Sequence, residues 1–297
     1  MTYLGFLMNK HALCWLNEKI IPAHQASISV FDHGLLYGDG IFEGLRFYSN
    51  KVFQLEAHLQ RLQESADAIS LKIPLSQDQI RQAIQQIIQQ YPQDSGYLRL
   101  VITRGIGSLG IDPLKCPQAN LFIIADELAV INTTHIDQGI KLLVASTRRM
   151  PAECLDPKIK SLNYLNNILS RIEANKAGMD EALMLNTRGF VTEGTVDNIF
   201  IIKDQQLITP SPSDGLLLGI TRDVILQIAK QLGLTTKEIS MTPDYLLQAD
   251  ECFLTGTGAE LIPVKQINQH QITTTQKPLF PDIAKAFNQT VINYCQN

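Results

Sequence analysis

The sequence has no long hydrophobic run, no block of like charge and no closely spaced pair of cysteines. A membrane-spanning helix needs roughly 18 or more consecutive apolar residues, so we expect no contact with a membrane. The 25 basic and 29 acidic residues are scattered, which makes nucleic-acid binding a poor interpretation. The segment from Met1 to Trp15 contains Lys10 and polar breaks, so we do not expect it to be a signal peptide.

Cysteine usage indicates a reducing compartment. The five cysteines are odd in number and widely spaced: Cys14, Cys116, Cys154, Cys252 and Cys295. This pattern favours neither a disulfide framework nor a metal site, and we predict no metal. With 297 residues, of which 45% are hydrophobic, the chain can bury the cores of two domains or of one large one. We therefore expect a cytoplasmic globular protein.

Helical and strand-like patterns are mixed in the first half of the chain, as in the α+β and α/β classes. Apolar residues at helical spacing predict a helix through Leu55, Leu59, Leu62, Ala66 and Ile69. A second helix is expected to begin at Ser76, where Ser76-Gln77-Asp78-Gln79 fits a capping box. The predicted strands are Ile41–Tyr48, Tyr97–Thr103 and Leu121–Ala125.

A polar stretch from Val130 to Gly139 suggests a boundary between two domains. We predict an N-terminal α/β domain over residues 1–129, a linker over 130–139 and a C-terminal domain over 140–297. The second half is expected to contain strands at 141–145, 181–185, 198–202 and 252–255, and helices at about 162–177, 221–232 and 281–294. Gly178 and Gly233 follow two of these helices as C-terminal stops.

The segment from Asp32 to Arg46 combines glycines with ionisable side chains. Its closely spaced glycines predict a tight turn before a strand. On that strand Phe42, Gly44 and Arg46 share one face, and the glycine leaves a hole that a ligand could fill. A β-bulge with ordinary core packing fits the same spacing.

Three further places could bind an anion, although each has a common structural interpretation. Arg61 lies on the first predicted helix, where an arginine is usually a solvated charge. Gly219-Ile220-Thr221-Arg222 opens a helix, and helix starts attract phosphate. The stretch from Thr255 to Ala259 follows an apolar strand and is typical of a turn with accessible amides or of a flexible loop.

Two features suggest carbonyl chemistry. Lys158 and Lys160 precede a predicted helix containing Tyr164, and a lysine beside buried structure can form a Schiff base. Spacing alone does not choose between the two lysines, and most lysines are only solvated. Glu193 ends an apolar strand, where a buried carboxylate needs a cationic partner.

Together these segments, in this order, make the sequence resemble the class IV (fold-type IV) pyridoxal-phosphate (PLP) aminotransferases, which share the D-amino acid aminotransferase fold. The resemblance extends from Trp15-Leu16-Asn17 to Pro263-Val264. Its strongest motifs are Tyr37-Gly38-Asp39-Gly40-Ile41-Phe42-Glu43-Gly44-Leu45-Arg46, His58-Leu59-Gln60-Arg61-Leu62, Lys160-Ser161-Leu162-Asn163-Tyr164, Glu193-Gly194-Thr195, Asn198, Leu218-Gly219-Ile220-Thr221-Arg222 and Thr255-Gly256-Thr257.

The resemblance implies roles for individual residues around PLP. Because the family lysine stands four residues before the tyrosine, Lys160 would carry the cofactor as a Schiff base and move the substrate proton. Tyr164 would bond the ring hydroxyl oxygen, and Glu193 would lie against the ring nitrogen. The remaining cofactor-binding residues, chiefly for the phosphate, would be Arg61, Leu218, Ile220, Thr221 and Thr257.

Within the family, the sequence is most similar to the branched-chain amino acid aminotransferases, which exchange amino groups between leucine, isoleucine or valine and 2-oxoglutarate. Phe42 and Gly44 would line the side-chain pocket, and Arg99 with Tyr37 would bind the second carboxylate of glutamate. Tyr97, Gly258 and Ala259 would bind the α-carboxylate. The alternatives are a D-amino acid aminotransferase, an aminodeoxychorismate lyase and an inactive PLP-binding homologue. The implied partners are amino acids, 2-oxo acids and a second copy of the chain, in a homodimer or larger homo-oligomer.

Overall fold

The computed structural model describes residues 9–127, 139–273 and 278–296. The chain forms two compact units, each with its own β-sheet. Unit one comprises residues 1–128, 159–163 and 291–297, and unit two comprises residues 129–158 and 164–290. Nearly all of the linker predicted at 130–139 lies outside the described residues, so the predicted domain boundary stays a prediction.

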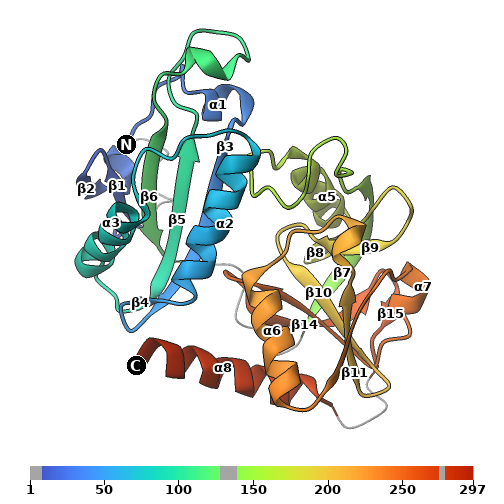
Figure 1. Cartoon of the computed structure of the whole chain (residues 1–297). Helices are drawn as coiled ribbons and strands as arrows, with labels where there is room; N and C mark the ends of the chain where they lie inside the picture. The colour runs from blue at the N-terminus through green and yellow to red at the C-terminus, as the bar shows by residue number, and fades with distance from the viewer. Residues whose placement is uncertain (1–8, 128–138, 274–277, 297) are drawn as a thin grey trace. The chain divides into compact units, whose positions relative to one another are not determined.

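Unit one is built on a six-stranded sheet in the order β2-β1-β6-β5-β3-β4 (Figure 1), with every neighbouring pair antiparallel. Helix α2 packs against β3, and α3 packs against β1 and β6. The elements are β1 (Leu13–Leu16), β2 (Lys19–Pro22), η2 (Ala23–Gln25), α1 (His33–Tyr37), β3 (Gly40–Tyr48), β4 (Lys51–Val52), α2 (Leu55–Ala68), α3 (Gln77–Gln90), β5 (Gly96–Thr103), η3 (Pro113–Lys115) and β6 (Asn120–Asp126).

The core of unit one lies between this sheet and its two long helices. Alternate residues of β3, Ile41, Leu45 and Phe47, are fully buried with Leu59 and Leu62 of α2. Because side chains alternate along a strand, the even-numbered residues of β3 from Phe42 to Arg46 lie on the opposite face of the sheet. The sequence pattern of β3 thereby separates a packing face from a face that is available for chemistry.

Unit two contains a nine-stranded mixed sheet in the order β12-β11-β10-β13-β14-β7-β8-β9, with β15 paired to β14. Helix α5 packs on β7 and β8, and α6 packs on β12 and β13. The elements are β7 (Ile140–Arg148), α5 (Leu165–Lys176), β8 (Glu181–Leu185), β9 (Val191–Gly194), β10 (Asn198–Lys203), β11 (Gln206–Pro210), η4 (Pro212–Asp214), α6 (Ile220–Gln231), β12 (Thr235–Ile239), α7 (Pro243–Leu246), β13 (Glu251–Gly256), β14 (Glu260–Ile267), β15 (His270–Gln271) and α8 (Phe280–Gln296), whose residues from 291 belong to unit one.

Local sequence signals located most of the elements correctly. Ser76 caps α3 in a complete capping box, and Gly178 and Gly233 adopt the positive φ expected of C-terminal stops. The helix predicted at about 162–177 is confirmed as α5, although it begins a little later, at Leu165. The reason is that Ser161 forms a bridge with Ile41 of β3, which keeps this segment extended.

The glycine-rich segment before β3 is also more structured than the predicted turn. Residues His33–Tyr37 form the short helix α1, capped by the Asp32 side chain and ended by Gly38 at a φ of 69°. Among the helices in the described parts of the chain, none is long and apolar enough to cross a membrane.

Candidate active site

Lys160 lies in unit one, on a short segment that extends along β3. Its carbonyl accepts a hydrogen bond from the Phe42 amide at 3.0 Å, and its own amide donates to the Ser65 hydroxyl of α2 at 3.1 Å. The Lys160 Nζ lies 4.6 Å from the centroid of the Phe42 ring. Backbone pairing with β3 on one side and the contact with α2 on the other therefore fix the backbone position of Lys160.

Phe42, Gly44, Tyr97 and Arg99 lie on one face of the β3–β5 pair. Gly44 is the direct partner of Arg99, and the Arg99 guanidinium lies 4.5 Å from the centroid of the Phe42 ring. A Cβ at Gly44 would lie only 2.2 Å from the Tyr97 hydroxyl oxygen. The predicted hole above Gly44 is thus occupied by the Tyr97 phenol, and no larger residue fits there without moving it. Burial raises the pKa of Tyr97, which keeps its hydroxyl protonated at neutral pH.

On the opposite face of β3, a buried ionic cluster joins Glu43 to helix α2. The Arg61 Nε and Nη2 donate to the two Glu43 carboxylate oxygens at 2.7 and 2.8 Å, and the His58 Nδ1 lies 2.7 Å from the same carboxylate. Glu43 is fully buried and His58 is 1% exposed. The Arg61 side chain is 11% exposed, so Arg61 is not the solvated surface charge that its helix position favoured. The bidentate pair fixes the plane of its guanidinium.

The cluster also determines which groups carry charge. Burial alone raises the pKa of Glu43, but the charges and hydrogen bonds of Arg61 and His58 outweigh it and lower the pKa to about 2. Burial lowers the pKa of His58 despite the neighbouring carboxylate. Glu43 is therefore ionised and His58 neutral at pH 7, and the cluster contains one ion pair, formed by Arg61 and Glu43, with a neutral imidazole beside the carboxylate.

This cluster predicts acid sensitivity. Because the pKa of Glu43 is lowered in the folded chain, its contribution to stability is complete above the usual value of 4.5 and is lost as the pH falls toward about 2. Glu43→Gln should lower the free energy of unfolding by about 2 to 3 kcal/mol at pH 7 and flatten its pH dependence below pH 4.5. Urea unfolding from pH 7 to pH 3 measures both effects. Glu64→Gln, at an exposed position of α2, is the control, and an unchanged slope in Glu43→Gln would contradict the prediction.

In unit two, Glu193 lies in β9 and is held by three other segments. Its Oε1 lies 2.8 Å from the Nε of Arg149, and its Oε2 accepts from the Leu217 amide at 3.0 Å and from the Asn198 Nδ2 at 3.4 Å. Glu193 is 5% exposed. The cationic partner expected for a buried carboxylate is thus present.

Asn198 connects Glu193 to the start of α6. Its Nδ2 also donates to the Leu217 carbonyl at 2.8 Å, and a Cβ at Gly219 would lie 2.0 Å from its Oδ1. Gly219 is the N-cap of α6, and within the described residues no side chain caps this helix. The amides at the start of α6, including those of Ile220 and Thr221, can therefore bind an anion such as a phosphate.

Several other predicted residues of unit two lie at turns or helix ends. Of the turn predicted over Thr255 to Ala259, Thr257, Gly258 and Ala259 form the turn between β13 and β14, whereas Thr255 and Gly256 end β13. Tyr164 is the N-cap of α5, and Leu218 lies in the loop before α6. In unit one, the Tyr37 hydroxyl accepts a hydrogen bond from the Gly110 amide at 2.9 Å.

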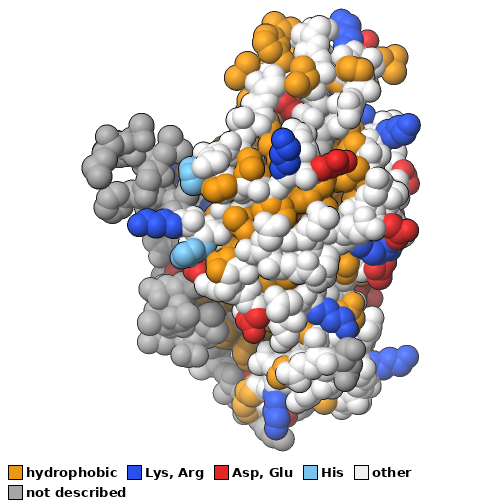
Figure 2. Space-filling view, turned by 90° about the vertical axis from the view of Figure 1, so that its left-hand side faces the viewer, with side chains coloured by type: hydrophobic (Ala, Val, Ile, Leu, Met, Phe, Trp, Pro, Cys, Tyr) orange, Lys and Arg blue, Asp and Glu red, His pale blue; other side chains and the backbone are white. Residues whose placement is uncertain are grey.

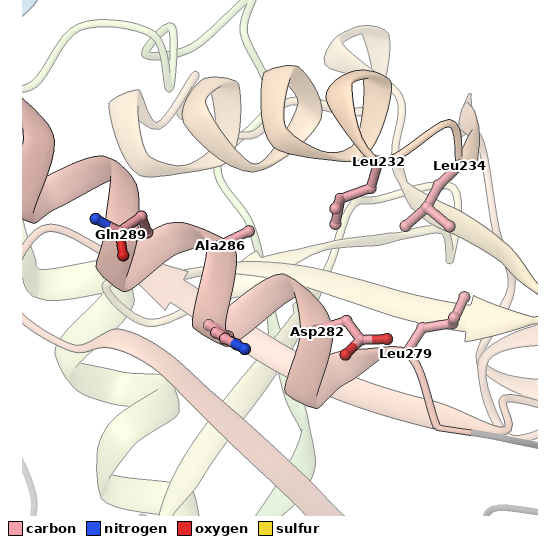
Figure 3. A pocket seen from close by; sticks show the side chains of 7 residues that line it. Leu232, Leu234, Leu279, Asp282, Ala286 and Gln289 are labelled. Atoms are coloured by element: carbon pink, nitrogen blue, oxygen red, sulfur yellow. The ribbon is translucent and has the colours of Figure 1, made fainter.

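A separate groove of unit two has a volume of about 460 Å³. It is lined by Leu232 and Leu234, which follow α6, and by Leu279 and residues of α8 (Figure 3). It presents mainly aliphatic surface with the charged groups Asp282 and Lys285. These residues are distinct from those predicted to carry chemistry.

Sequence reasoning missed Glu43, His58 and Arg149. A signal for the first two was present, because Glu43 alternates with Ile41 and Leu45 on the packing face of a strand, where a carboxylate requires a partner. His58 and Arg61 are three residues apart and therefore lie on the same side of a helix. For Arg149 the sequence offers no comparable signal.

The fold and these residues define a class IV aminotransferase, and the family model for "Amino-transferase class IV" matches residues 40–267. A Methanocaldococcus jannaschii relative, provisionally named a branched-chain-amino-acid aminotransferase, is 44% identical over 88% of this chain and 90% of its own length. The branched-chain-amino-acid aminotransferase of Escherichia coli K12 is 32% identical over 87% of this chain and 85% of its own length.

Solved structures agree with these relatives. The branched-chain amino acid aminotransferase of T.th., complexed with N-(5′-phosphopyridoxyl)-L-glutamate, superposes with a TM-score of 0.88 at 34% identity, covering 95% of this chain and 94% of that chain. The chain therefore belongs to the branched-chain amino acid aminotransferase family, and its two-sheet fold is that of the fold-type IV enzymes.

Proposed function

We propose that this chain catalyses PLP-dependent transamination between leucine, isoleucine or valine and 2-oxoglutarate. The observation that carries the proposal is the face around Gly44, where the Phe42 ring lies 4.5 Å from the Arg99 guanidinium. An apolar ring suits an aliphatic side chain, and a guanidinium suits the second carboxylate of glutamate. The T.th. relative has been solved with ligands of both kinds, a phosphopyridoxyl-glutamate and 4-methylvaleric acid.

Two features of unit two support PLP as the cofactor. The uncapped start of α6 suits a phosphate, with Leu218, Ile220, Thr221 and Thr257 as proposed contacts. The buried carboxylate of Glu193 suits a protonated ring nitrogen. We assign the ring hydroxyl to Tyr164 and a further phosphate contact to Arg61. Structures of the T.th. relative contain pyridoxamine 5′-phosphate or a phosphopyridoxyl adduct.

When bound, PLP supplies an electron sink for cleavage of the substrate Cα–H bond. Lys160 takes the proton from Cα and later returns one, as general base and then general acid. Glu193 holds a proton at the ring nitrogen. Tyr97 and the amides of Gly258 and Ala259 bind the substrate α-carboxylate, while Arg99 with Tyr37 binds the distal carboxylate of the dicarboxylic substrate.

The proposal is tested by spectra of PLP-loaded protein in single-turnover half-reactions. L-Leucine, L-isoleucine, L-valine and L-glutamate should each convert the cofactor to its amine form, and 2-oxoglutarate should restore the original spectrum. A response to D-alanine in preference to L-leucine would assign the chain to the D-amino acid aminotransferases. No response to any amino donor would identify a binding protein without turnover.

Arg61 provides a separate test of cofactor binding. Arg61→Ala should weaken PLP affinity by about 1.5 to 3 kcal/mol, the range for hydrogen bonds to charged groups, while turnover at saturating PLP falls less. Titration of the apoprotein with PLP measures the affinity. Arg61→Lys keeps the charge but loses the bidentate geometry. Its PLP affinity should therefore lie between that of the wild type and that of Arg61→Ala. Because Arg61 also partners Glu43, urea unfolding of each apoprotein separates lost binding from lost stability. An unchanged PLP affinity would limit Arg61 to its pairing with Glu43.

We also propose that the chain is located in the cytoplasm, where its five free thiols stay reduced.

We further propose that the chain works as at least a homodimer. Unit one exposes a concentration of large apolar side chains around α1 and in the loop between β5 and β6, seen at the top of Figure 2. They include Val30, Phe31, Leu35, Ile106, Leu109, Ile111 and Leu114. A concentration of exposed apolar side chains is typical of protein–protein contacts. Sedimentation at the mass of a single chain would contradict the proposal.

A further inference from the structure

Arg149 follows β7 and is fixed at both its backbone and its side chain. Its amide donates to the carbonyl of Leu185, the last residue of β8, at 2.8 Å. Its Nη1 donates to the Oδ1 of Asn167 in α5 at 3.2 Å. The side chain is 12% exposed and forms an ion pair with Glu193, with its Nε 2.8 Å from the Glu193 Oε1. A long, flexible side chain is thus held in a single position beside a buried carboxylate.

The surroundings make the charge of Arg149 important for Glu193. The other carboxylate oxygen of Glu193 accepts from the Leu217 amide and the Asn198 amide group, which are neutral donors. Arg149 therefore brings a full positive charge into direct contact with this carboxylate. Water screens such a pair little, because Glu193 is 5% exposed.

The following inference rests on the proposed function, since it needs PLP at Glu193. We infer that Arg149 is a positioning residue that moderates how strongly Glu193 holds a proton on the ring nitrogen of the cofactor. A carboxylate partly neutralised by a guanidinium stabilises a neighbouring cation less than an unpaired carboxylate does. Arg149 therefore lowers the proton affinity of the ring nitrogen below the value that Glu193 alone would give. At the same time it holds the Glu193 carboxylate in place.

A purely structural role makes a different prediction. Arg149 contacts Asn167, whose Nδ2 donates to the Thr195 carbonyl just after β9, so truncation could simply loosen this strand end. Loosening would weaken cofactor binding in every variant that shortens the side chain. It would not move the titration of the ring nitrogen according to the charge at residue 149. The titration therefore separates the two roles.

The experiment uses full-length protein loaded with ring-¹⁵N-labelled PLP and follows the ring nitrogen by solid-state ¹⁵N NMR as a function of pH. Arg149→Gln removes the charge and keeps a hydrogen-bonding side chain, and Arg149→Lys keeps the charge. Arg148→Gln is the matched control, because the neighbouring Arg148 side chain contacts the Ala145 carbonyl instead. We expect the ring nitrogen of Arg149→Gln to lose its proton about 1 pH unit or more above the wild type. Arg149→Lys and Arg148→Gln should titrate like the wild type.

Three outcomes would overturn the inference while leaving the proposed function intact. The first is an unchanged titration in Arg149→Gln. The second is an equal shift in Arg149→Gln and Arg149→Lys, which would exclude charge as the cause. The third is that Arg149→Gln fails to hold PLP at millimolar concentration while Arg149→Lys holds it, which would make the charge a requirement for binding. If the wild type itself binds no PLP, the proposed function fails together with the inference.

Discussion

Replacing Lys160 by alanine is expected to reduce transamination by at least about 10³-fold, within the range that a positioned general acid–base contributes. The loss should appear in both half-reactions, because in the proposed mechanism the same amine takes and returns the proton. The protein should still fold, since Lys160 is joined to Phe42 and Ser65 through its backbone carbonyl and amide. Single-turnover spectra with L-leucine and with 2-oxoglutarate measure the two losses.

Lys158 is the matched control for Lys160. It lies two residues earlier and is exposed, and its amide is fixed by the Asp156 side chain at 2.9 Å. Lys158→Ala should keep the visible absorbance of lysine-bound PLP and near wild-type rates, whereas Lys160→Ala should lose that absorbance. If Lys158→Ala loses the absorbance and Lys160→Ala keeps it, the roles of the two lysines are reversed.

Local signals in the sequence were sufficient for elements whose geometry is decided within a few residues. Ser76 and Gln79 form their capping box from neighbouring backbone and side-chain groups, and Gly178 ends α5 because it tolerates a positive φ. The exact start of α5 depends on Ser161 pairing with Ile41, far away in the chain. Periodicity in the sequence carries no information about that pairing.

The candidate site shows the same division between local and distant information. The shared face of Phe42 and Gly44 follows from strand alternation, but the Tyr97 phenol above Gly44 depends on the register between β3 and β5. Similarly, the need of Glu193 for a cation follows from burial, whereas Arg149 as that cation follows only from the folded sheet. The sequence indicated that Glu193 requires a cationic partner if it is buried, and the tertiary structure identified Arg149 as that partner.

Arg99→Ala should impair the half-reaction with glutamate or 2-oxoglutarate more than the half-reaction with leucine. If Arg99 binds the distal carboxylate of glutamate or 2-oxoglutarate, its loss leaves that carboxylate buried and unpaired, at a cost of about 2 to 5 kcal/mol in kcat/KM. Leucine has no second carboxylate and should be affected far less. Part of the loss for leucine will come from packing, because the guanidinium also covers the Phe42 ring. The two half-reactions, followed separately by the cofactor spectrum, give the two losses.

Two further variants identify why Arg99→Ala loses activity with glutamate. Arg99→Lys retains a cation without the bidentate fork and should recover part of the glutamate reaction. Arg46→Gln removes a different arginine from the same face of the sheet, where the Arg46 guanidinium lies 5.3 Å from the centroid of the Tyr48 ring, and should not distinguish the substrates. Equal losses for leucine and glutamate in Arg99→Ala would instead assign Arg99 to the α-carboxylate or to the packing of Phe42 and Tyr97. Dual substrate recognition would then have to come from residues other than this arginine.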